Sequence, residues 1–152
     1  MKLVHYSGEK LEGKPYYHDS PISEIKPNGF WVSDDDCEDN WKTWCEGEDF
    51  RLDRLKYRYE IKLYKNNKIQ IITNNKELQQ FSYNFAKQSI ENITPWYLDW
   101  NRVKELYDGV IITPHMWDVR LDYIWYSIWD CASGVIWNMN VIKSYTLLTK
   151  DE

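Results

Sequence analysis

The spacing of apolar and polar residues predicts several short β-strands separated by turns. The clearest alternation is at residues 57–63, where four apolar residues are interleaved with three charged ones. Two asparagines at 66–67 predict a tight turn, and the isoleucines at 69–72 predict a return strand, so we expect a β-hairpin here. Apolar runs at 2–7 and 29–33 predict two strands nearer the N-terminus.

Helical spacing and capping residues predict helices between these strands. Residues 38–46 are expected to form a short helix, and Asp34–Asp36 a solvated turn at its N-terminus, where negative charge is favourable. Residues 74–77 match a capping box, which predicts a helix that runs to about residue 91. A further helix is expected over 99–106, capped by its first residue.

The remaining segments complete a mixed α+β pattern. Residues 8–28 are rich in Gly and Pro and predict a long loop, and 107–112 predict a turn into a buried strand. Residues 126–148 predict two or three strands, broken near 133–134 and at 138–140. No repeat or flexible linker divides the sequence, so we expect one α+β domain over residues 1–152.

Composition narrows the possible partners of the chain. Its 19 basic and 24 acidic residues give a net charge of −5, which does not steer the whole molecule toward nucleic acid or anionic membrane. A local basic groove is possible around 56–68. The three cysteines are scattered and odd in number, which favours reduced thiols over a disulfide framework. With no signal-peptide pattern and no membrane-length apolar run, we expect a cytoplasmic protein without a membrane partner.

Aromatic residues are the unusual feature of the composition. Nine Trp and twelve Tyr can build a core, and a cluster of them can also form the walls of a site for a flat ligand such as nicotinamide or an unstacked base. The three histidines show no paired spacing, so no metal site is expected. Phosphate-binding glycine loops and the GxSxG elbow are absent from the sequence.

Three short motifs stand in a defined order along the chain. His5-Tyr6-Ser7 ends the first strand, Trp31-Val32-Ser33 ends the second, and an apolar-aromatic run at 135–143 follows Ser133 near the C-terminus. In this order the motifs resemble those of the ADP-ribosyltransferases, and the turn at 107–109 is similar to one that recurs in that family. The resemblance implies a split β-sheet core with inserted helices, and NAD as a substrate.

The resemblance also implies roles for individual residues. His5 would donate or accept a hydrogen bond at a ribose hydroxyl of NAD, and the main chain of Tyr6 would bracket the nicotinamide amide. Trp31 would stack on the nicotinamide ring, and Ser33 would orient the neighbours of the catalytic acid. Ser7 completes the expected NAD-binding set.

The catalytic acid is the point at which the sequence departs from the family. A Glu is expected just before the last apolar strand, where this chain has Ala132 and Ser133, and Asp130 lies two residues upstream. Two explanations are open: Ala132 replaces a catalytic Glu in a deliberately inactivated protein, or the chain is a natural variant that uses Asp130 or has lost catalysis. Under the first, Ala132→Glu is predicted to give NAD cleavage.

The leading hypothesis is therefore a mono-ADP-ribosyltransferase similar to small bacterial or phage toxins, acting in a toxin–antitoxin or phage-defence system. Its acceptor would be a macromolecule, either a protein or single-stranded nucleic acid, and an antitoxin protein would be a further partner. The alternative is a non-catalytic, aromatic-rich module that recognises a protein or nucleic acid. A third interpretation is an α+β domain whose tryptophans only build the core.

Overall fold

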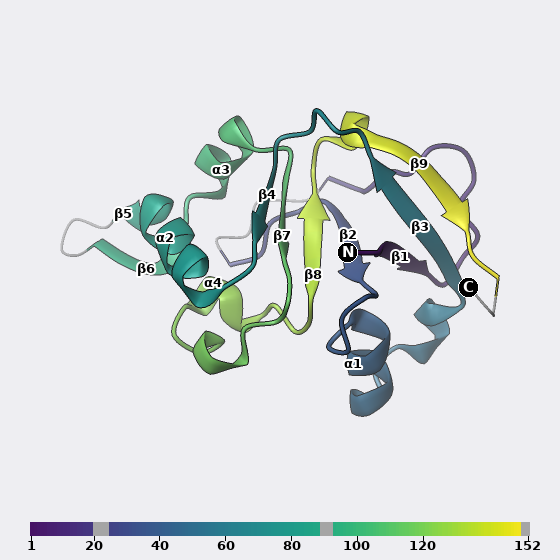
Figure 1. Cartoon of the computed structure of the whole chain (residues 1–152), viewed down its shortest axis with the longest axis horizontal. Coiled ribbons are helices and arrows are strands. Elements are labelled where there is room, and N and C mark those ends of the chain that lie inside the picture. Colours follow the sequence, from purple (N-terminus) through teal and green to yellow (C-terminus); the bar gives the residue numbers. More distant parts are fainter. Residues whose placement is uncertain (20–24, 89–92, 150–152) are drawn as a thin grey trace.

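A mixed seven-stranded sheet organises the computed structural model, which describes residues 1–19, 25–88 and 93–149 (Figure 1). The order of its strands is β4-β7-β8-β2-β1-β3-β9, and neighbours are antiparallel except for β4 and β7. The strands of this sheet are β1 (Leu3–Ser7), β2 (Phe30–Asp34), β3 (Tyr57–Leu63), β4 (Ile69–Ile72), β7 (Gly109–Ile112), β8 (Ser133–Ile136) and β9 (Ile142–Leu147).

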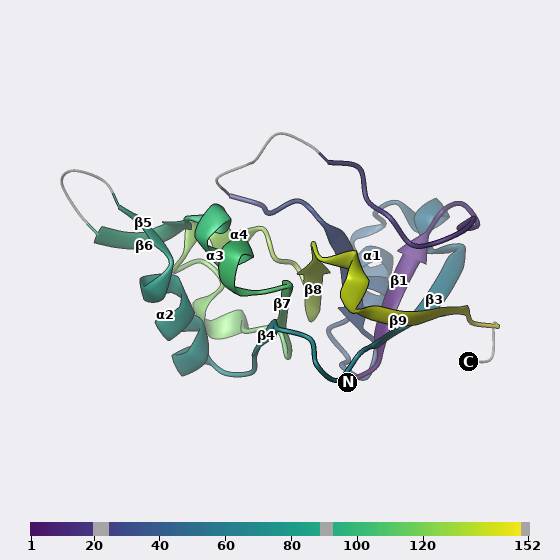
Figure 2. The ribbon, with the colours of Figure 1, turned by 90° about the horizontal axis from the view of Figure 1, so that it is seen from above.

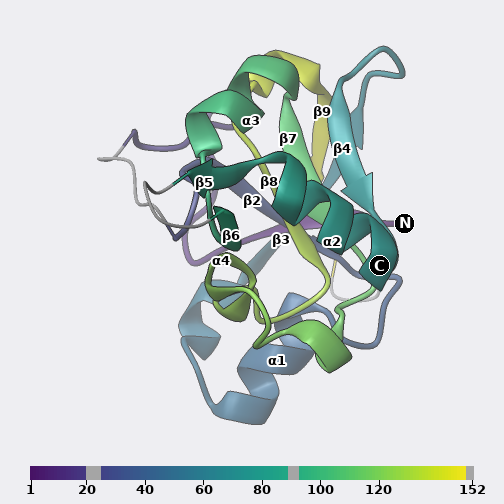
Figure 3. The ribbon, with the colours of Figure 1, turned by 90° about the vertical axis from the view of Figure 1, so that its left-hand side faces the viewer.

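Helices and a small second sheet are attached to this frame. Strands β5 (Ala86–Gln88) and β6 (Ile93–Leu98) pair with each other. The helices are α1 (Trp41–Glu48), α2 (Asn75–Asn84), α3 (Trp100–Leu106) and α4 (Ile124–Ser127), with 3-10 turns at Leu52–Leu55, Trp117–Val119 and Met139–Val141. Helices α2 and α3 gather at the β4–β7 end of the molecule, whereas α1 lies apart from them near β1 and β2 (Figure 3).

Two apolar clusters cover the two faces of the sheet. Alternate residues of a strand point to opposite faces, so Val110 joins one cluster and Ile111 the other. The first cluster packs α2, α3 and α4 on β7 and β8 and contains the fully buried Trp125. The second includes Leu11 and Tyr17, from the part of the segment after β1 that runs beside the sheet (Figure 2). The large aromatic content is therefore in part core.

Most of the expected elements are confirmed. Strands form at β1, β2 and β7, and helices at α1 and α3, within a few residues of the expected bounds. The N-cap of the expected capping box is also present: the Asn74 side chain accepts a hydrogen bond from the Glu77 N–H at 2.9 Å, and the Glu77 carboxylate accepts from the Thr73 N–H at 2.9 Å. The described parts of 8–28 contain no helix or strand, as expected for a loop, although residues 20–24 lie outside the described part of the chain.

The expected hairpin at 57–72 is wrong. Strand β3 pairs with β1 and β9, and β4 pairs in parallel with β7. Both edges of β3 are occupied, and the start of β4 is held elsewhere: the Asp108 carboxylate accepts from the Lys68 N–H at 2.7 Å, and the Asp108 N–H donates to the Lys68 carbonyl at 2.9 Å. The turn at 107–109 therefore recruits β4, and the tight turn at 66–67 does not return the chain onto β3.

Two boundaries also differ from the expectation. Helix α2 ends at Asn84 because the chain continues into β5, which is hydrogen-bonded to β6. Residues 89–91 of the expected helix lie outside the described residues. The expected break at 133–134 is instead the start of β8. Gly134 is required there, since a Cβ would lie 2.5 Å from Ile111 Cγ1 and 2.7 Å from the Val110 carbonyl oxygen.

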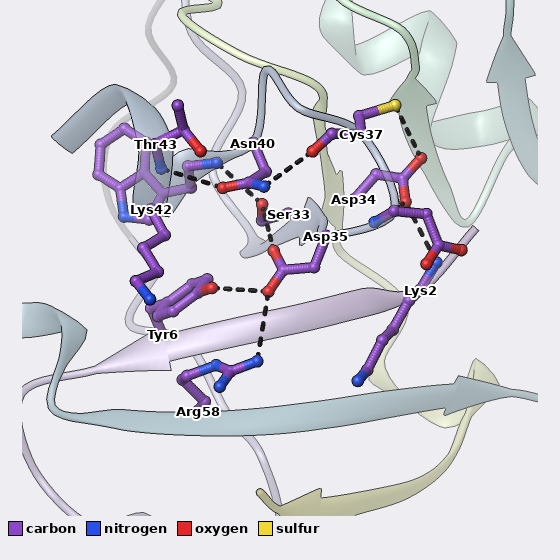
Figure 4. A network of polar contacts seen from close by, with 12 residues as sticks. Lys2, Tyr6, Ser33, Asp34, Asp35, Cys37, Asn40, Lys42, Thr43 and Arg58 are labelled. Carbon is purple, nitrogen blue, oxygen red and sulfur yellow. Dashed lines mark hydrogen bonds and ion pairs between the residues drawn. The ribbon is translucent and has the colours of Figure 1, made fainter. Parts of the chain in front are cut away.

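The solvated turn expected at Asp34–Asp36 is confirmed in part: residues 35 and 36 form a turn and Asp36 is exposed, but Asp34 ends β2. Asp34 is buried, and its carboxylate accepts hydrogen bonds from Thr113 Oγ1 at 2.6 Å and from the Lys2 N–H at 3.1 Å (Figure 4). The N-cap of α1 is Asn40, whose side chain accepts from the Thr43 N–H. The Asp34 carboxylate thus connects the end of β2 to Lys2, which precedes β1, and to Thr113, which follows β7.

Candidate functional site

The two strands that carry the N-terminal motifs separate partway along their length. Strands β1 and β2 pair only through Leu3↔Asp34 and Val4↔Ser33, whereas β1 keeps pairing with β3 as far as Ser7. The Lys2 carbonyl accepts from the Asp35 N–H at 2.8 Å, so even-numbered residues of β1 direct their main-chain groups toward β2. The main chain of Tyr6 consequently points to the side on which the ladder with β2 has ended.

A pocket of about 320 Å³ lies at this separation. Its volume is at the lower end of the range for small-molecule sites, enough for part of a dinucleotide. The pocket brings together most of the residues that the sequence singled out, from three distant parts of the chain. These lining residues are His5, Tyr6, Trp31, Ser33, Asp130 and Ser133.

His5 bridges the separated strands as a neutral imidazole. Its Nδ1 lies 2.7 Å from the Trp31 carbonyl oxygen and donates to it, and its ring stacks on Phe30 with centroids 4.0 Å apart. Burial lowers the pKa of His5, and the hydrogen bond to Trp31 only partly offsets this effect. Because Nδ1 carries the proton, Nε2 is the nitrogen with a lone pair that can accept a hydrogen bond from a ligand hydroxyl.

Trp31 offers a half-buried aromatic wall. Its ring meets the edge of Trp129, with centroids 4.8 Å apart. The ammonium of Lys26 lies 4.8 Å from the centroid of the Trp31 ring, which is a cation–π contact. The indole N–H of Trp129 donates to the Ser133 carbonyl at 3.2 Å, so β8 holds this second ring in place.

A hydrogen-bonded network fixes the Tyr6 side of the pocket (Figure 4). The Tyr6 hydroxyl donates to Asp35 at 2.6 Å, Ser33 Oγ donates to the other oxygen of Asp35 at 3.0 Å, and Arg58 lies 3.8 Å from Asp35. Burial and the Asp35 carboxylate raise the pKa of Tyr6, so its hydroxyl stays protonated. Ser33 also accepts from the Trp41 N–H at 3.0 Å. Ser33 thus positions Asp35 and the first turn of α1.

Three positions near the start of β8 were considered for the catalytic carboxylate, and they differ in their surroundings. Asp130 lines the pocket and is half-buried. Burial raises its pKa, while the positive charges of Lys26 and Arg120 act in the opposite direction. Ser133 also lines the pocket, but it is buried and its Oγ donates to the Cys131 carbonyl at 3.0 Å.

Ala132 is placed differently from its neighbours. It has no exposed surface and is not among the residues that line the pocket. Its N–H donates to the Asp39 carbonyl at 2.7 Å, and its carbonyl accepts from the Asp34 N–H at 2.9 Å. The position therefore joins β8 to the segment between β2 and α1, and a longer side chain here would enter the packed interior.

Ser7 is the other expected site residue that the structure leaves outside the pocket. Its hydroxyl donates to the Glu9 carbonyl at 2.6 Å and accepts from the Glu9 N–H at 3.2 Å, which closes a local turn after β1.

Several lining residues were missed by sequence reasoning, namely Lys26, Trp41, Arg54 and Trp129. They come from loops, α1 and a 3-10 turn, and only the fold brings them beside β1 and β2. Trp129 was the one with a usable signal, because it directly precedes Asp130.

Other kinds of site have less support. Within residues 1–19, 25–88 and 93–149, no group of three His, Cys, Asp or Glu side chains could hold a metal ion. None of the helices in the described part of the chain combines the length and apolar character needed to span a bilayer. Cys37, Cys45 and Cys131 are free thiols.

Comparison with known proteins returns no relative: no family model, no curated protein and no solved structure matches this chain.

Proposed function

We propose that this chain is a NAD-dependent mono-ADP-ribosyltransferase and that the pocket between β1 and β2 is its NAD site. The observation that carries the proposal is the meeting of residues from all three motifs in one pocket, although the third motif lies about 100 positions or more beyond the other two. Neither helical nor strand periodicity would bring His5, Trp31 and Asp130 together.

The pocket suits the nicotinamide end of NAD. His5 presents a neutral Nε2 for a ribose hydroxyl, and Trp31 presents an aromatic face on which a nicotinamide ring can stack. The main chain of Tyr6 points into the separation, where it can bracket the carboxamide. NAD supplies a glycosidic bond whose cleavage develops positive charge on the ribose.

We assign Asp130 as the catalytic carboxylate, in place of the Glu expected from the resemblance. A carboxylate in a partly desolvated pocket stabilises developing positive charge more strongly than one in water, and it can receive the proton of an attacking nucleophile. Asp130 satisfies the requirement for a carboxylate that lines the pocket, whereas Ala132 is enclosed. Of the two explanations left open by the sequence, the burial of Ala132 favours the natural variant that uses Asp130.

The test is release of nicotinamide from NAD by the purified chain. Asp130→Asn keeps the size of the side chain and removes its charge, and it is expected to lower the rate of release by about 10²–10³-fold. The matched control is Asp122→Asn, an exposed carboxylate outside the pocket, which should leave the rate unchanged. Equal rates for the wild type and Asp130→Asn would remove Asp130 from the mechanism.

A non-catalytic binding module remains the second candidate function. It is favoured by the aromatic surface next to the pocket, where Trp41 and Trp44 stack with centroids 5.2 Å apart and Phe50 is 40% exposed. Binding of NAD without any release of nicotinamide, at any enzyme concentration, would support this module. The nature of the acceptor and the existence of an antitoxin stay predictions.

A further inference from the structure

Lys26 is the cation closest to the Trp31 ring among the described lining residues, and the roles proposed above do not use it. Its ammonium lies 4.8 Å from the centroid of the Trp31 ring and lines the pocket together with Asp130. It also acts on Asp130 electrostatically, in the direction that favours the carboxylate. The pocket therefore holds a positive charge at the aromatic wall and a negative charge at the assigned acid.

This arrangement matters because the charge of the ligand moves during the reaction. The nicotinamide ring of NAD carries a positive charge that is lost when it leaves. In the proposed reaction the bond between the ring nitrogen and C1′ of the ribose breaks, and its electron pair stays on the nitrogen, so nicotinamide departs neutral. The acceptor, water in the simplest case, forms the new bond to C1′ and gives its proton to Asp130 or to solvent.

We propose that Lys26 is a charge-steering residue that opposes binding of the cationic nicotinamide ring and favours its departure as a neutral molecule. The proposal rests on the NAD site proposed above. The ammonium competes with the ring for the face of Trp31 before the bond breaks, because both are cations attracted by the same indole. After cleavage this repulsion is gone, so the barrier to bond breaking is lowered at the expense of affinity.

A residue that merely binds NAD would show the opposite pattern. Loss of an ordinary ionic contact, for example to the pyrophosphate, weakens binding. Loss of ground-state repulsion tightens binding and slows the chemical step. The sign of the change in affinity therefore separates the two roles without reference to how large either effect is.

The experiment compares the wild type with Lys26→Met, which keeps most of the length of the side chain and removes its charge. Dissociation constants are measured by titration calorimetry for NAD, for 1-methylnicotinamide, which is a cation, and for nicotinamide, which is neutral. We expect Lys26→Met to bind NAD and 1-methylnicotinamide about 3- to 30-fold more tightly, with less than about a twofold change for nicotinamide. The rate of nicotinamide release at saturating NAD should fall about tenfold.

Two further variants guard the interpretation. Lys26→Arg retains the charge and should behave like the wild type, and Lys14→Met removes an exposed charge from the same loop and should change nothing. Circular dichroism establishes whether each variant is folded. If Lys26→Met does not fold, Lys26→Gln takes its place as the neutral variant. Unchanged or weaker binding of NAD in the neutral variants would overturn the role of Lys26. Absence of NAD binding in the wild type would overturn the proposed function as well.

Discussion

The two edges of strand β2 show how one strand can serve stability on one side and ligand binding on the other. Toward β8 the ladder is complete over four residue pairs, from Phe30↔Ile136 to Ser33↔Ser133. On its other side β8 approaches β7 so closely that Gly134 has no room for a side chain. Toward β1 the ladder stops after Val4↔Ser33. The closed edge lies between apolar clusters, whereas the open edge borders a pocket with titratable groups.

The difference lies in what replaces the missing main-chain hydrogen bonds. Beyond Val4 the link between β1 and β2 is the imidazole of His5, which donates to the Trp31 carbonyl. A side-chain bridge of this kind leaves main-chain groups and ring atoms available to a ligand, which a complete ladder does not. The following predictions test whether the two edges differ in this way.

Ala132→Glu tests whether position 132 belongs to the closed edge of β2 or to the pocket at the open edge, and it has the largest expected effect. If the residue is part of the closed edge, a buried carboxyl without partners should lower the free energy of unfolding by about 3–5 kcal/mol without increasing NAD cleavage. Urea denaturation and nicotinamide release measure the two quantities. Thr146→Glu, at an exposed position of β9, is the control. A stable Ala132→Glu protein with faster cleavage would restore the explanation of an inactivated enzyme.

Gly134→Ala tests how closely β8, the strand that closes this edge of β2, packs against its other neighbour, β7. The new Cβ would lie 2.8 Å from Ile111 Cα as well as near the Val110 carbonyl, so β7 and β8 must move apart, at a cost of about 3 kcal/mol. The control is Gly47→Ala in α1, where nothing lies within 4 Å and the better helix propensity should stabilise the fold by about 0.5–1 kcal/mol. Thermal unfolding compares the pair, and equal melting temperatures would show that the seam is looser than described.

Ser33→Ala and Ser7→Ala compare two serines of the N-terminal motifs. Ser33 is buried with hydrogen bonds to Asp35 and to the Trp41 N–H, so its loss should cost about 1–2 kcal/mol. Ser7 closes a local turn outside the pocket, and its loss should cost less than about 0.5 kcal/mol. A larger effect for Ser7→Ala in chemical denaturation would contradict this ranking.

The effect of pH on stability is expected to be smaller. It should arise at His115, in the segment after β7 and outside the pocket. Burial, assisted by the charge of Arg120, lowers the pKa of His115 to about 4, whereas an unfolded histidine titrates near 6.5. Between these values the unfolded chain binds a proton that the folded chain does not, so stability falls as the pH falls from about 6.5 to about 4. His115→Asn should reduce this fall between pH 7 and pH 4.5, by about 1 kcal/mol or more. An unchanged pH dependence would exclude His115 as a source.

The sequence was informative where structure depends on local pattern. Period-two alternation identified β3 and single apolar runs identified β1 and β7, because each strand shows its buried face in its own residues. It failed where the partner of a strand is chosen by distant residues: β4 joins β7 through Asp108, forty positions away from Lys68. Gly134 was interpreted as a break for a related reason, since the close approach that requires glycine is made by another strand.

In the candidate site, too, the sequence indicated some residues by their local pattern and missed those that only the fold brings together. The order of the motifs led to His5, Trp31 and Asp130, which line one pocket. Lys26 and Arg54 carried no signal, because a loop and a 3-10 turn bring them near these residues, and no periodicity encodes the course of either segment. The enclosure of Ala132 was equally hidden, since it depends on the main chain of Asp34 and Asp39.

The central claim is that the open edge of β2, and not the closed one, binds NAD. Titration of NAD into the isotope-labelled protein, followed by amide and indole resonances in NMR spectra, tests it most directly. We predict saturable shifts for the amides of His5 and Tyr6 and for the Trp31 indole, with little change at Ile111 and Gly134. Shifts confined to another surface, or no shifts at millimolar NAD, would contradict the account.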